Sequence, residues 1–290
     1  MKNNSDLKYD YDIVLQDKQS SHTRILEMVR EGSLVLEIGC ASGYMTKYLN
    51  EKLNCRVVGI EIDEGAAGFA EPFCEELIIG DVEALDFEER FSEKKFDYVI
   101  MADILEHLKV PKDLLKRLRR LLKDSGCILI SIPNGAHGAV ALELLDGRID
   151  YRDTGLLDNT HLRFFDKDHI LSTLDEAGYL VSHLDRIIVH PMDTELKTRW
   201  ESYPREVTAY IEKVNPEYKT YQFIIKAFPT TESGWREGLE DAVRSQRRKR
   251  AEIEKRFEET KKKVKDLEKD VSRLNAELEE KETRHLEVLN

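Results

Sequence analysis

The sequence predicts an α/β protein with a doubly wound, Rossmann-like sheet whose strands are mostly parallel. The stretch VLEIGCASGY, residues 35–44, joins an apolar run to an acidic residue, a Gly-rich turn and an amphipathic segment, which is the strand–turn–helix order of such folds. Short apolar runs then alternate with helix-like segments as far as residue 134, a pattern typical of parallel strands joined by crossover helices. Residues 234–290 instead carry a heptad pattern, which predicts a C-terminal α-helical coiled coil.

The first half of the domain supplies five predicted strands and the helices between them. Ser20 or Ser21 caps an opening helix that ends at Gly32. The strands are expected at residues 33–38, 55–62, 76–80, 96–103 and 127–133, and the helices at residues 42–53, 63–73 and 112–124. Pro111 opens the last of these helices, because the first residue of a helix needs no N–H.

The second half adds one helix and two strands. Asp166 caps a helix expected at residues 167–178, a β-rich run follows at residues 179–190, and a last strand is expected at residues 220–229. The chain therefore divides into an N-terminal segment (1–20), a domain (21–233) with a helical insertion (190–220), and a coiled coil (234–290).

The C-terminal segment is rich in Glu, Lys and Arg, and a seam of mostly apolar residues runs through it. The seam alternates steps of four and three residues: Ile253, Phe257, Thr260, Val264, Leu267, Val271, Leu274 and Leu278. Valine at the a positions and leucine at the d positions of the heptad favours a coiled coil of two parallel helices. We expect this segment to join two copies of the chain; the alternative is a single solvated charged helix.

Composition excludes several classes of protein. The formal net charge of −12 argues against a nucleic-acid-binding surface, which needs clustered Lys and Arg. The first residues lack the apolar core of a signal peptide, and no run approaches membrane-spanning length. We therefore expect no transmembrane segment and a cytoplasmic location, peripheral to the inner membrane only through partners. The four cysteines show no pairing or metal-ligand spacing and are expected to be reduced thiols.

The Gly-rich turn separates two classes of cofactor. A dinucleotide fingerprint starting at Gly39 would need glycine at the positions of Ala41 and Tyr44, which disfavours an NAD-dependent enzyme. The pattern acidic-x-Gly-x-x-x-Gly, formed by Glu37, Gly39 and Gly43, instead resembles motif I of the class I S-adenosylmethionine-dependent methyltransferases. Ala41 replaces a glycine common in that family. Because alanine tolerates positive φ less well, we expect the turn to differ slightly.

The signals that carry the resemblance follow the first four strands, in the family's order and spacing, over about a hundred residues. The resemblance as a whole covers roughly residues 20–228. It implies five α/β units followed by a closing hairpin, and therefore a seven-stranded sheet. Glu61, at the end of the second strand, would accept from two ribose hydroxyls, since an ionised carboxylate only accepts. Asp81 would accept from the adenine amino group, and Val82 would supply a backbone contact.

MADILEHL, residues 101–108, follows the fourth strand and resembles the motif of that position in the family. Ala102 and Asp103 would face the methionine end of the cofactor, with His107 behind it. The cofactor-binding candidates are Glu37, Gly39, Cys40, Ala41, Gly43, Tyr44, Glu61, Ile62, Asp81, Val82, Ala102, Asp103 and His107. The implied cofactor is S-adenosylmethionine, with S-adenosylhomocysteine as product.

The polar segment after the fifth strand is where the resemblance places the acceptor. THLRFF, residues 160–165, resembles an element of methyltransferases from bacterial and archaeal polysaccharide gene clusters. When the acceptor is an alcohol its proton must pass to a base, and His161 is the candidate, with Asp158 or Asp103 as orienter or alternative base. His161 could equally anchor the loop as a hydrogen-bond donor. Some sugar methyltransferases use Mg²⁺, which leaves a metal site open, but no carboxylate cluster demands one and none is predicted.

These observations predict an S-adenosylmethionine-dependent O-methyltransferase that acts on a sugar hydroxyl of a surface polysaccharide or related glycan. The acceptor would be a glycan or lipid-linked saccharide, and the coiled coil would form a homodimer or set the distance to a partner such as a glycosyltransferase. Two alternatives remain: methylation of a small lipid or quinone hydroxyl, and a non-catalytic scaffold that binds the cofactor.

Overall fold

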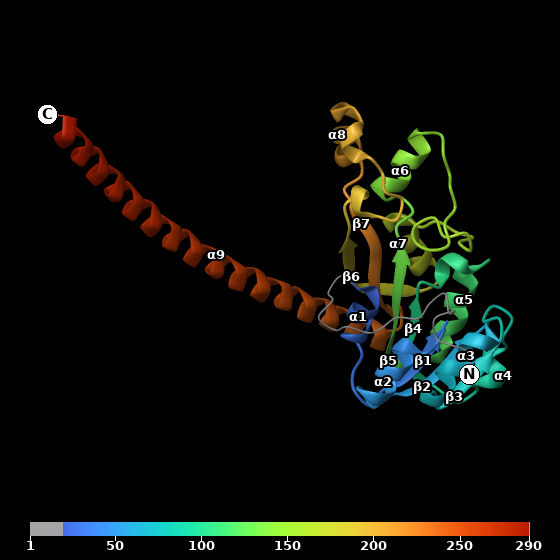
Figure 1. The fold of residues 1–290 in the computed structure, drawn as a ribbon. Coiled ribbons are helices and arrows are strands. Elements are labelled where there is room, and N and C mark those ends of the chain that lie inside the picture. The colour runs from blue at the N-terminus through green and yellow to red at the C-terminus, as the bar shows by residue number, and fades with distance from the viewer. Residues whose placement is uncertain (1–19, 290) are drawn as a thin grey trace. The chain divides into compact units, whose positions relative to one another are not determined.

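The computed structural model describes residues 20–289, with side chains up to residue 273. Within this range lies one seven-stranded sheet with the order β3-β2-β1-β4-β5-β7-β6 (Figure 1). The strands are β1 (Leu34–Ile38), β2 (Arg56–Glu61), β3 (Glu76–Ile79), β4 (Phe96–Ala102), β5 (Leu122–Pro133), β6 (Tyr179–Ile188) and β7 (Thr220–Pro229). The first five strands are parallel, whereas β7 pairs antiparallel with both β5 and β6. The predicted Rossmann-like, mostly parallel, seven-stranded sheet is confirmed.

Helices connect these strands. They are α1 (Ser21–Leu26), α2 (Tyr44–Glu51), α3 (Glu64–Ala70), α4 (Phe87–Arg90), α5 (Pro111–Leu118), α6 (Gly138–Leu145), α7 (Lys167–Glu176), α8 (Arg205–Val214) and α9 (Glu232–Leu289), with 3-10 turns η2 (Glu71–Phe73), η3 (Leu105–His107), η4 (Arg119–Leu121), η5 (Pro191–Asp193) and η6 (Trp200–Ser202). Ser20, rather than Ser21, caps α1, because its side chain accepts from the Thr23 N–H. The N-terminal segment before Ser20 lies outside the described residues.

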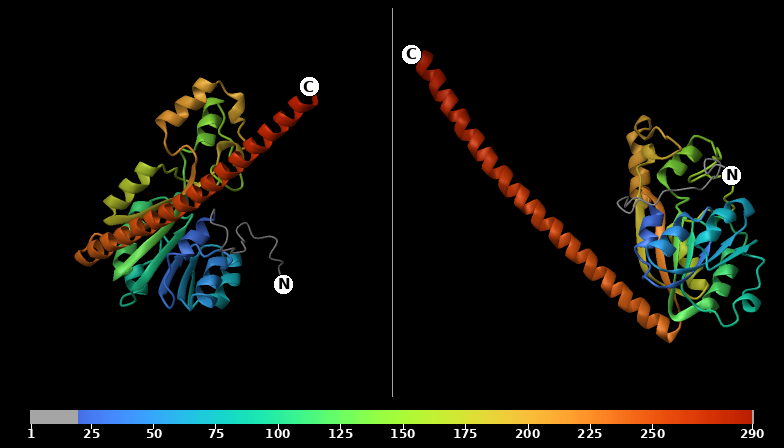
Figure 2. Two further views of the ribbon diagram at one scale, coloured as in Figure 1. Left: turned by 90° about the vertical axis from the view of Figure 1, so that its left-hand side faces the viewer. Right: turned by 60° about the horizontal axis from the view of Figure 1, so that its bottom comes forward.

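Helices cover both faces of the sheet, because successive side chains of a strand point to opposite faces and both faces are apolar. In β1, Leu36 and Ile38 belong to the core on the face covered by α4, α5 and α7, whereas Val35 belongs to the core on the face covered by α1 and α2. Figure 2 shows the helices on either side of the strands. Both faces of the central strands are therefore buried, as their continuous apolar runs require.

Two segments differ from the prediction. α5 stops at Leu118 because η4 turns the chain directly into Leu122, so the predicted helix end at residue 124 already belongs to β5. The segment after β5, expected as a loop, begins with helix α6. Its Leu142 packs on Trp200 and Ile211 from the predicted insertion, so two polar-rich segments bury each other's apolar residues beyond the sheet.

A half-buried ion pair joins β6 to the turn before β7. Arg186 donates from Nε and Nη2 to the Glu217 carboxylate at 2.7 and 2.6 Å, and Thr220 donates to it at 2.6 Å. The Arg186 guanidinium, with Thr220 and the nearby Lys167, lowers the pKa of Glu217 from its ordinary 4.5 to about 2. This stabilisation is therefore present above pH 4.5 and is lost as the pH falls from 4.5 towards 2.

Glu217→Gln is expected to lower the free energy of unfolding at pH 7 by about 2 kcal/mol, a value reduced for partial exposure of the pair. Urea unfolding of wild type and variant measures this difference, which should nearly disappear at pH 2.5. The control is Glu176→Gln, since Glu176 pairs with Lys112 at the exposed surface and should show no measurable change. A difference for Glu217→Gln that persisted unchanged at pH 2.5 would contradict the assignment.

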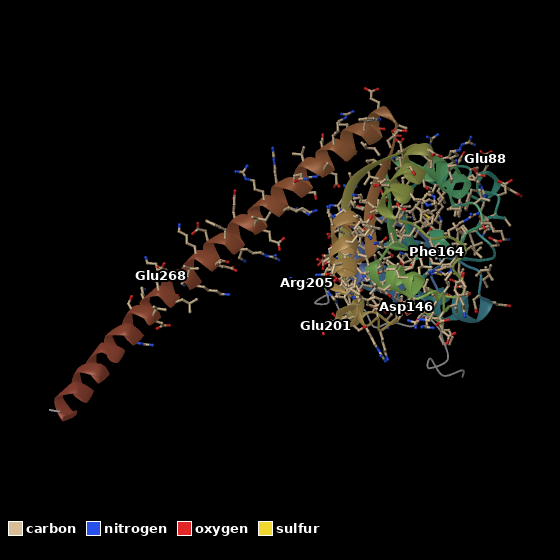
Figure 3. The ribbon with its side chains drawn as sticks, turned by 90° about the horizontal axis from the view of Figure 1, so that it is seen from above. Glu88, Asp146, Phe164, Glu201, Arg205 and Glu268 are labelled. Carbon is tan, nitrogen blue, oxygen red and sulfur yellow. The ribbon has the colours of Figure 1, made fainter. Side chains whose placement is uncertain are left out.

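The chain divides into two units, at Glu240 and Asp241, and the second consists of the remainder of α9. Side chains stand out all round this helix in Figure 3, Glu268 among them. The seam residues Ile253, Phe257 and Leu267 are each more than 60% exposed. The helix is thus confirmed, whereas its pairing into a coiled coil stays a prediction, and the side chains of Leu274 and Leu278 lie outside those described.

In the described part of the chain no helix is both long and apolar enough to cross a membrane.

Candidate functional site

A cavity of about 990 Å³ opens at the carboxyl ends of the parallel strands. Doubly wound folds bind their ligands at this edge, and the volume suits a small molecule. The cofactor candidates that line it are Gly39, Ala41, Tyr44, Glu61, Ile62, Asp81, Val82, Ala102, Asp103 and His107, and Asp158 and His161 line it as well. The fold therefore gathers in one cavity most of the residues that the sequence singled out.

The Gly-rich turn between β1 and α2 takes three residues into the left-handed region of the backbone. Gly39, Ala41 and Gly43 have φ angles of 73°, 46° and 82°. Ala41 thus adopts the left-handed conformation in spite of its Cβ, and the expected slight difference from the turn of the family stays a prediction. The Glu61 carboxylate accepts from the Ala41 N–H at 2.8 Å and so helps to hold this strained residue in place.

Glu61, the last residue of β2, is a hub of backbone hydrogen bonds. One of its oxygens accepts from Ala41, and the other accepts from Ile62 and Asp63 at 2.8 and 2.9 Å. A carboxylate offers about four acceptor sites, so roughly one remains for a ligand in the cavity. Glu61 thus fits the predicted contact with ribose hydroxyls, and the structure adds a second role in fixing the turn.

Three cofactor candidates do not line the cavity. Glu37 points into the core, where it accepts from Thr46 Oγ1 at 2.7 Å, and burial raises its pKa to about 8. Cys40 is buried beside the Cys74 thiol. A Cβ on Gly43 would lie 2.6 Å from Cα of Ala70 in α3. These three residues therefore contact the protein interior on the side of the turn that faces away from the cavity.

Asp103, directly after β4, lines the cavity and contacts two further strands. Its Oδ1 accepts from Ser131 Oγ on β5 at 2.8 Å and from Gln222 Nε2 on β7 at 3.0 Å. It also has a positive φ of 56°. A non-glycine residue held in this region by surrounding contacts is typical of functional sites.

The THLRFF loop is tied to the segment after β4. The Glu106 carbonyl accepts from the N–H groups of Leu162 and Arg163 at 2.8 and 3.0 Å, which brings His161 beside η3. Burial and the neighbouring His107 lower the pKa of His161. The imidazole is therefore neutral at pH 7 and able to accept a proton.

Asp158 lies in the same loop, and its side chain shapes it. Its Oδ1 accepts from the Thr160 N–H at 2.8 Å and from Thr160 Oγ1 at 2.5 Å. The structure brings His161, Asp158 and Asp103 together around one cavity, and their catalytic roles stay predictions.

The sequence did not single out Glu106, the most deeply buried acid of the site. Its side chain is 1% exposed, and its Oε1 lies 4.0 Å from His161 Nε2. Burial first, and then the negative charges of Asp103 and Asp158, raise the pKa of Glu106 well above its usual range. The available signal was its place directly before His107, within an otherwise apolar ILEHL.

Other lining residues come from distant segments that no local motif marks: Thr154, Glu195, Tyr221 and Gln222. His137, directly before α6, is fully buried and caps that helix. Its Nδ1 accepts from the Ala139 N–H, and its Nε2 donates to the Val189 carbonyl at 3.0 Å. Its position between these partners makes it a structural residue.

Comparison with known proteins identifies this architecture. Residues 14–184 match the family model described as "Methyltransferase domain". The chain is 26% identical over 105 residues to (S)-tetrahydroprotoberberine N-methyltransferase of Eschscholzia californica, which covers 35% of this chain and 30% of that protein. The chain thus spans only about a third of the first curated relatives that it matches.

Two further similarities cover more of the chain. It is 21% identical over 190 residues to the ubiquinone biosynthesis O-methyltransferase of Aeromonas salmonicida, which covers 64% of this chain and 78% of that protein. The crystal structure of an S-adenosylmethionine-dependent methyltransferase from Archaeoglobus fulgidus superposes with a TM-score of 0.53 at 20% identity, covering 74% of this chain and 94% of the other. The latter shows a shared fold.

Proposed function

The chain belongs to the S-adenosylmethionine-dependent methyltransferases, and on this premise we propose that its acceptor is a sugar hydroxyl of a surface polysaccharide or related glycan. S-adenosylmethionine supplies the methyl group when bound, and S-adenosylhomocysteine is the product. We assign cofactor binding to the Gly-rich turn, Glu61 and Asp81, and the acceptor side to the segment around Asp158 and His161.

The polar lining that the segments after β5 bring to the cavity is the observation that carries the sugar assignment. Thr154, Asp158, His161 and Glu195 all line the cavity. Carboxylates, hydroxyls and imidazole are suited to a ligand that offers many hydroxyl donors. Lys109 is the one Lys or Arg among the described residues that line the cavity, which suits a neutral acceptor better than a phosphorylated one.

A labelled-methyl assay tests this proposal. Purified chain is incubated with S-adenosylmethionine carrying a radioactive methyl group and with neutral oligosaccharides, and transfer to the sugar is measured. Alkali-stable label in the oligosaccharide supports a sugar ether. Binding of S-adenosylhomocysteine without transfer to any acceptor would instead support the non-catalytic scaffold.

A quinol is the second candidate acceptor, because the alignment with the ubiquinone biosynthesis O-methyltransferase covers 64% of this chain and 78% of that protein. The same assay with a short-chain catechol quinol separates the two classes. Transfer to the quinol with none to oligosaccharides would replace the sugar proposal.

His161→Ala is expected to lower turnover at least tenfold, because it removes the proposed proton acceptor of the cavity. The affinity for S-adenosylhomocysteine should stay within about twofold, since His161 lies at the acceptor end. Steady-state kinetics and calorimetry measure the two quantities, with His169→Ala, an exposed histidine of α7, as the control. Unchanged turnover would remove His161 from the mechanism.

We propose that the exposed seam of α9 pairs two copies of the chain and holds the catalytic unit at a set distance from a glycosyltransferase or a lipid-linked saccharide. Leu267→Asp should convert a dimer into a monomer, because a charge at a d position opposes pairing. Ser272→Asp, outside the seam, should leave the dimer intact. Sedimentation velocity distinguishes the two states, and a monomeric wild-type chain would contradict the pairing.

A further inference from the structure

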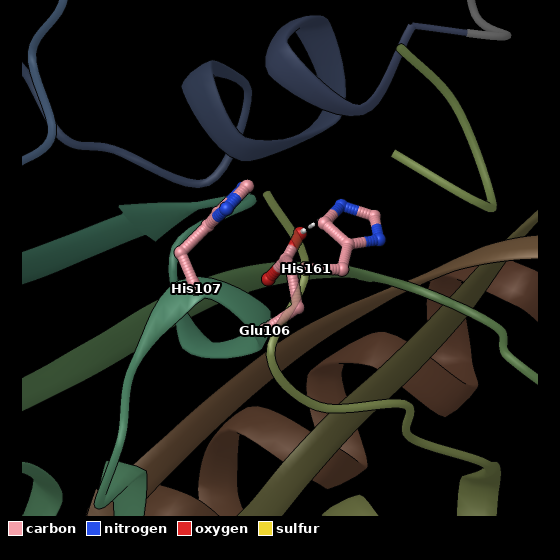
Figure 4. Close-up of side chains that lie close together, drawn as sticks. All are labelled: Glu106, His107 and His161. Atoms are coloured by element: carbon pink, nitrogen blue, oxygen red, sulfur yellow. Dashed lines mark ion pairs between the residues drawn. The ribbon is translucent and has the colours of Figure 1, made fainter. Parts of the chain in front are cut away.

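Three potential metal ligands meet at the acceptor end of the cavity. Glu106, His107 and His161 each offer one ligand atom, and these atoms lie within 4.8 Å of one another. Figure 4 shows the Glu106 carboxylate between the two imidazole rings. The rings pack edge to face with centroids 4.9 Å apart. Two residues come from η3 and one from the THLRFF loop, which the Glu106 carbonyl helps to hold beside η3.

The carboxylate of this cluster lacks partners although it is buried. Neither oxygen of Glu106 accepts a hydrogen bond from the described part of the chain, and Nδ1 of His161 is likewise buried without a partner there. A buried carboxyl group is normally hydrogen-bonded when neutral, and paired or bound to a metal when ionised. Among the described residues, four buried side-chain nitrogen or oxygen atoms have no hydrogen-bond partner, and three of these four atoms belong to this cluster. The site therefore has coordination capacity that the protein itself does not use.

His107 is already oriented as a ligand. Its Nδ1 lies 3.2 Å from the Thr160 carbonyl, which can only accept, so Nδ1 carries the proton. The lone pair is thereby left on Nε2. Histidines that bind metals usually donate their other N–H to a carbonyl or carboxylate in this way, which fixes the ring and its tautomer.

We propose that Glu106, His107 and His161 bind one divalent transition-metal ion beside the acceptor. Two imidazoles and one carboxylate suit Zn²⁺ or a neighbouring first-row ion better than Mg²⁺ or Ca²⁺, which prefer oxygen ligands. Three protein ligands leave a coordination position open, as in catalytic zinc sites. Ligand atoms around such an ion are about 3.4 Å apart at bond lengths of about 2.0–2.1 Å, so modest side-chain rotation from the present spacing closes the site.

This inference rests on the proposed function for the position of the acceptor. The open coordination position takes the acceptor hydroxyl, whose acidity rises when its oxygen binds a cation. The proton passes to the Asp158 carboxylate. The oxygen then forms a bond to the methyl carbon as the carbon–sulfur bond breaks, and the sulfur keeps the electron pair. With the metal bound, the His161 imidazole is a ligand and cannot also take the proton, so Asp158, the alternative base, replaces it in that role. His161→Ala is expected to lower turnover in either role.

Metal binding is measured on the full chain without reference to catalysis. The chain is stripped with a chelator, checked by elemental analysis and titrated with Zn²⁺, Mn²⁺ and Mg²⁺ by calorimetry. We expect one Zn²⁺ per chain and no comparable binding of Mg²⁺. Glu106→Gln and His161→Gln should each weaken Zn²⁺ binding at least 100-fold. Glu143→Gln is the matched control, because Glu143 is also buried with an unpartnered oxygen but lies outside the cavity, and it should bind like wild type.

A second measurement separates this inference from the proposed function. Turnover and S-adenosylhomocysteine affinity are recorded for stripped and Zn²⁺-loaded chain. Loss of turnover on stripping, with cofactor affinity retained, supports the metal site. Full turnover without metal, or Zn²⁺ binding that the Glu106 and His161 variants leave unchanged, overturns it while leaving the methyltransferase intact. Binding of one Zn²⁺ per chain, abolished in these variants, supports the metal site even if no sugar is methylated. In that case the proposed sugar acceptor is wrong, and the metal site is not.

Discussion

Gly43→Ala is expected to destabilise the catalytic unit by about 3 kcal/mol and to reduce cofactor binding. Gly43 has a φ of 82°, and its new Cβ would lie 2.6 Å from Cα of Ala70 and 2.9 Å from Cβ of Ala70. The strained backbone costs on the order of 1–3 kcal/mol, and the overlap with α3 adds roughly 1–3 kcal/mol. Because the overlap is with backbone, no side-chain rotation relieves it.

Thermal unfolding and calorimetry with S-adenosylhomocysteine measure the two effects. The melting temperature should fall by roughly 10 °C for a unit of this size. Gly68→Ala in α3 is the matched control, because a Cβ there meets nothing within 4 Å and the residue is helical. That substitution should stabilise by about 0.5–1 kcal/mol. Equal melting temperatures for the two variants would contradict this role of Gly43.

Glu61→Gln is expected to weaken S-adenosylhomocysteine binding about 10- to 100-fold, which corresponds to about 1.4–2.8 kcal/mol. The amide keeps the volume of the side chain but replaces one accepting oxygen with a donor. That donor would face either the Ala41 N–H or the N–H groups of Ile62 and Asp63. Repulsion between donors would release the turn, and the loss of charge would weaken the contact with ribose hydroxyls.

Calorimetry at constant temperature records the affinity, and Glu64→Gln serves as the control. Glu64 is exposed in the first turn of α3 and does not line the cavity. Its substitution should leave the affinity within about twofold of wild type. If Glu61→Gln bound as tightly as wild type, neither the turn nor the ribose contact could depend on this carboxylate.

The sequence predicted those parts of the site that follow single strands. A carboxylate at the end of a buried strand reaches the carboxyl edge of the sheet whatever the rest of the chain does, and Glu61, Asp81 and Asp103 could be placed on that ground alone. Ala41 shows the limit of such local reasoning. Its left-handed backbone opposes its own preference and is held by Glu61, which is twenty residues away.

The acceptor side depended on contacts between segments that lie far apart in the sequence. Glu106 and His161 are 55 positions apart, and they meet because the Glu106 carbonyl accepts two N–H groups of the THLRFF loop. Gln222 reaches Asp103 because β7 pairs antiparallel beside β5. Neither of these two contacts produces a periodic or compositional pattern in the sequence from which it could be predicted.

The amino-acid sequence by itself thus determined the order of the strands along the chain, the parallel sheet and the cofactor-binding edge, since these follow from local periodicity and from short-range turn chemistry. Only the tertiary structure decided that Glu37 and Cys40 lie behind the turn, and that Glu106 is buried between two histidines with its carboxylate unpartnered. The physical reason is that burial and hydrogen-bond satisfaction depend on which distant segments pack together.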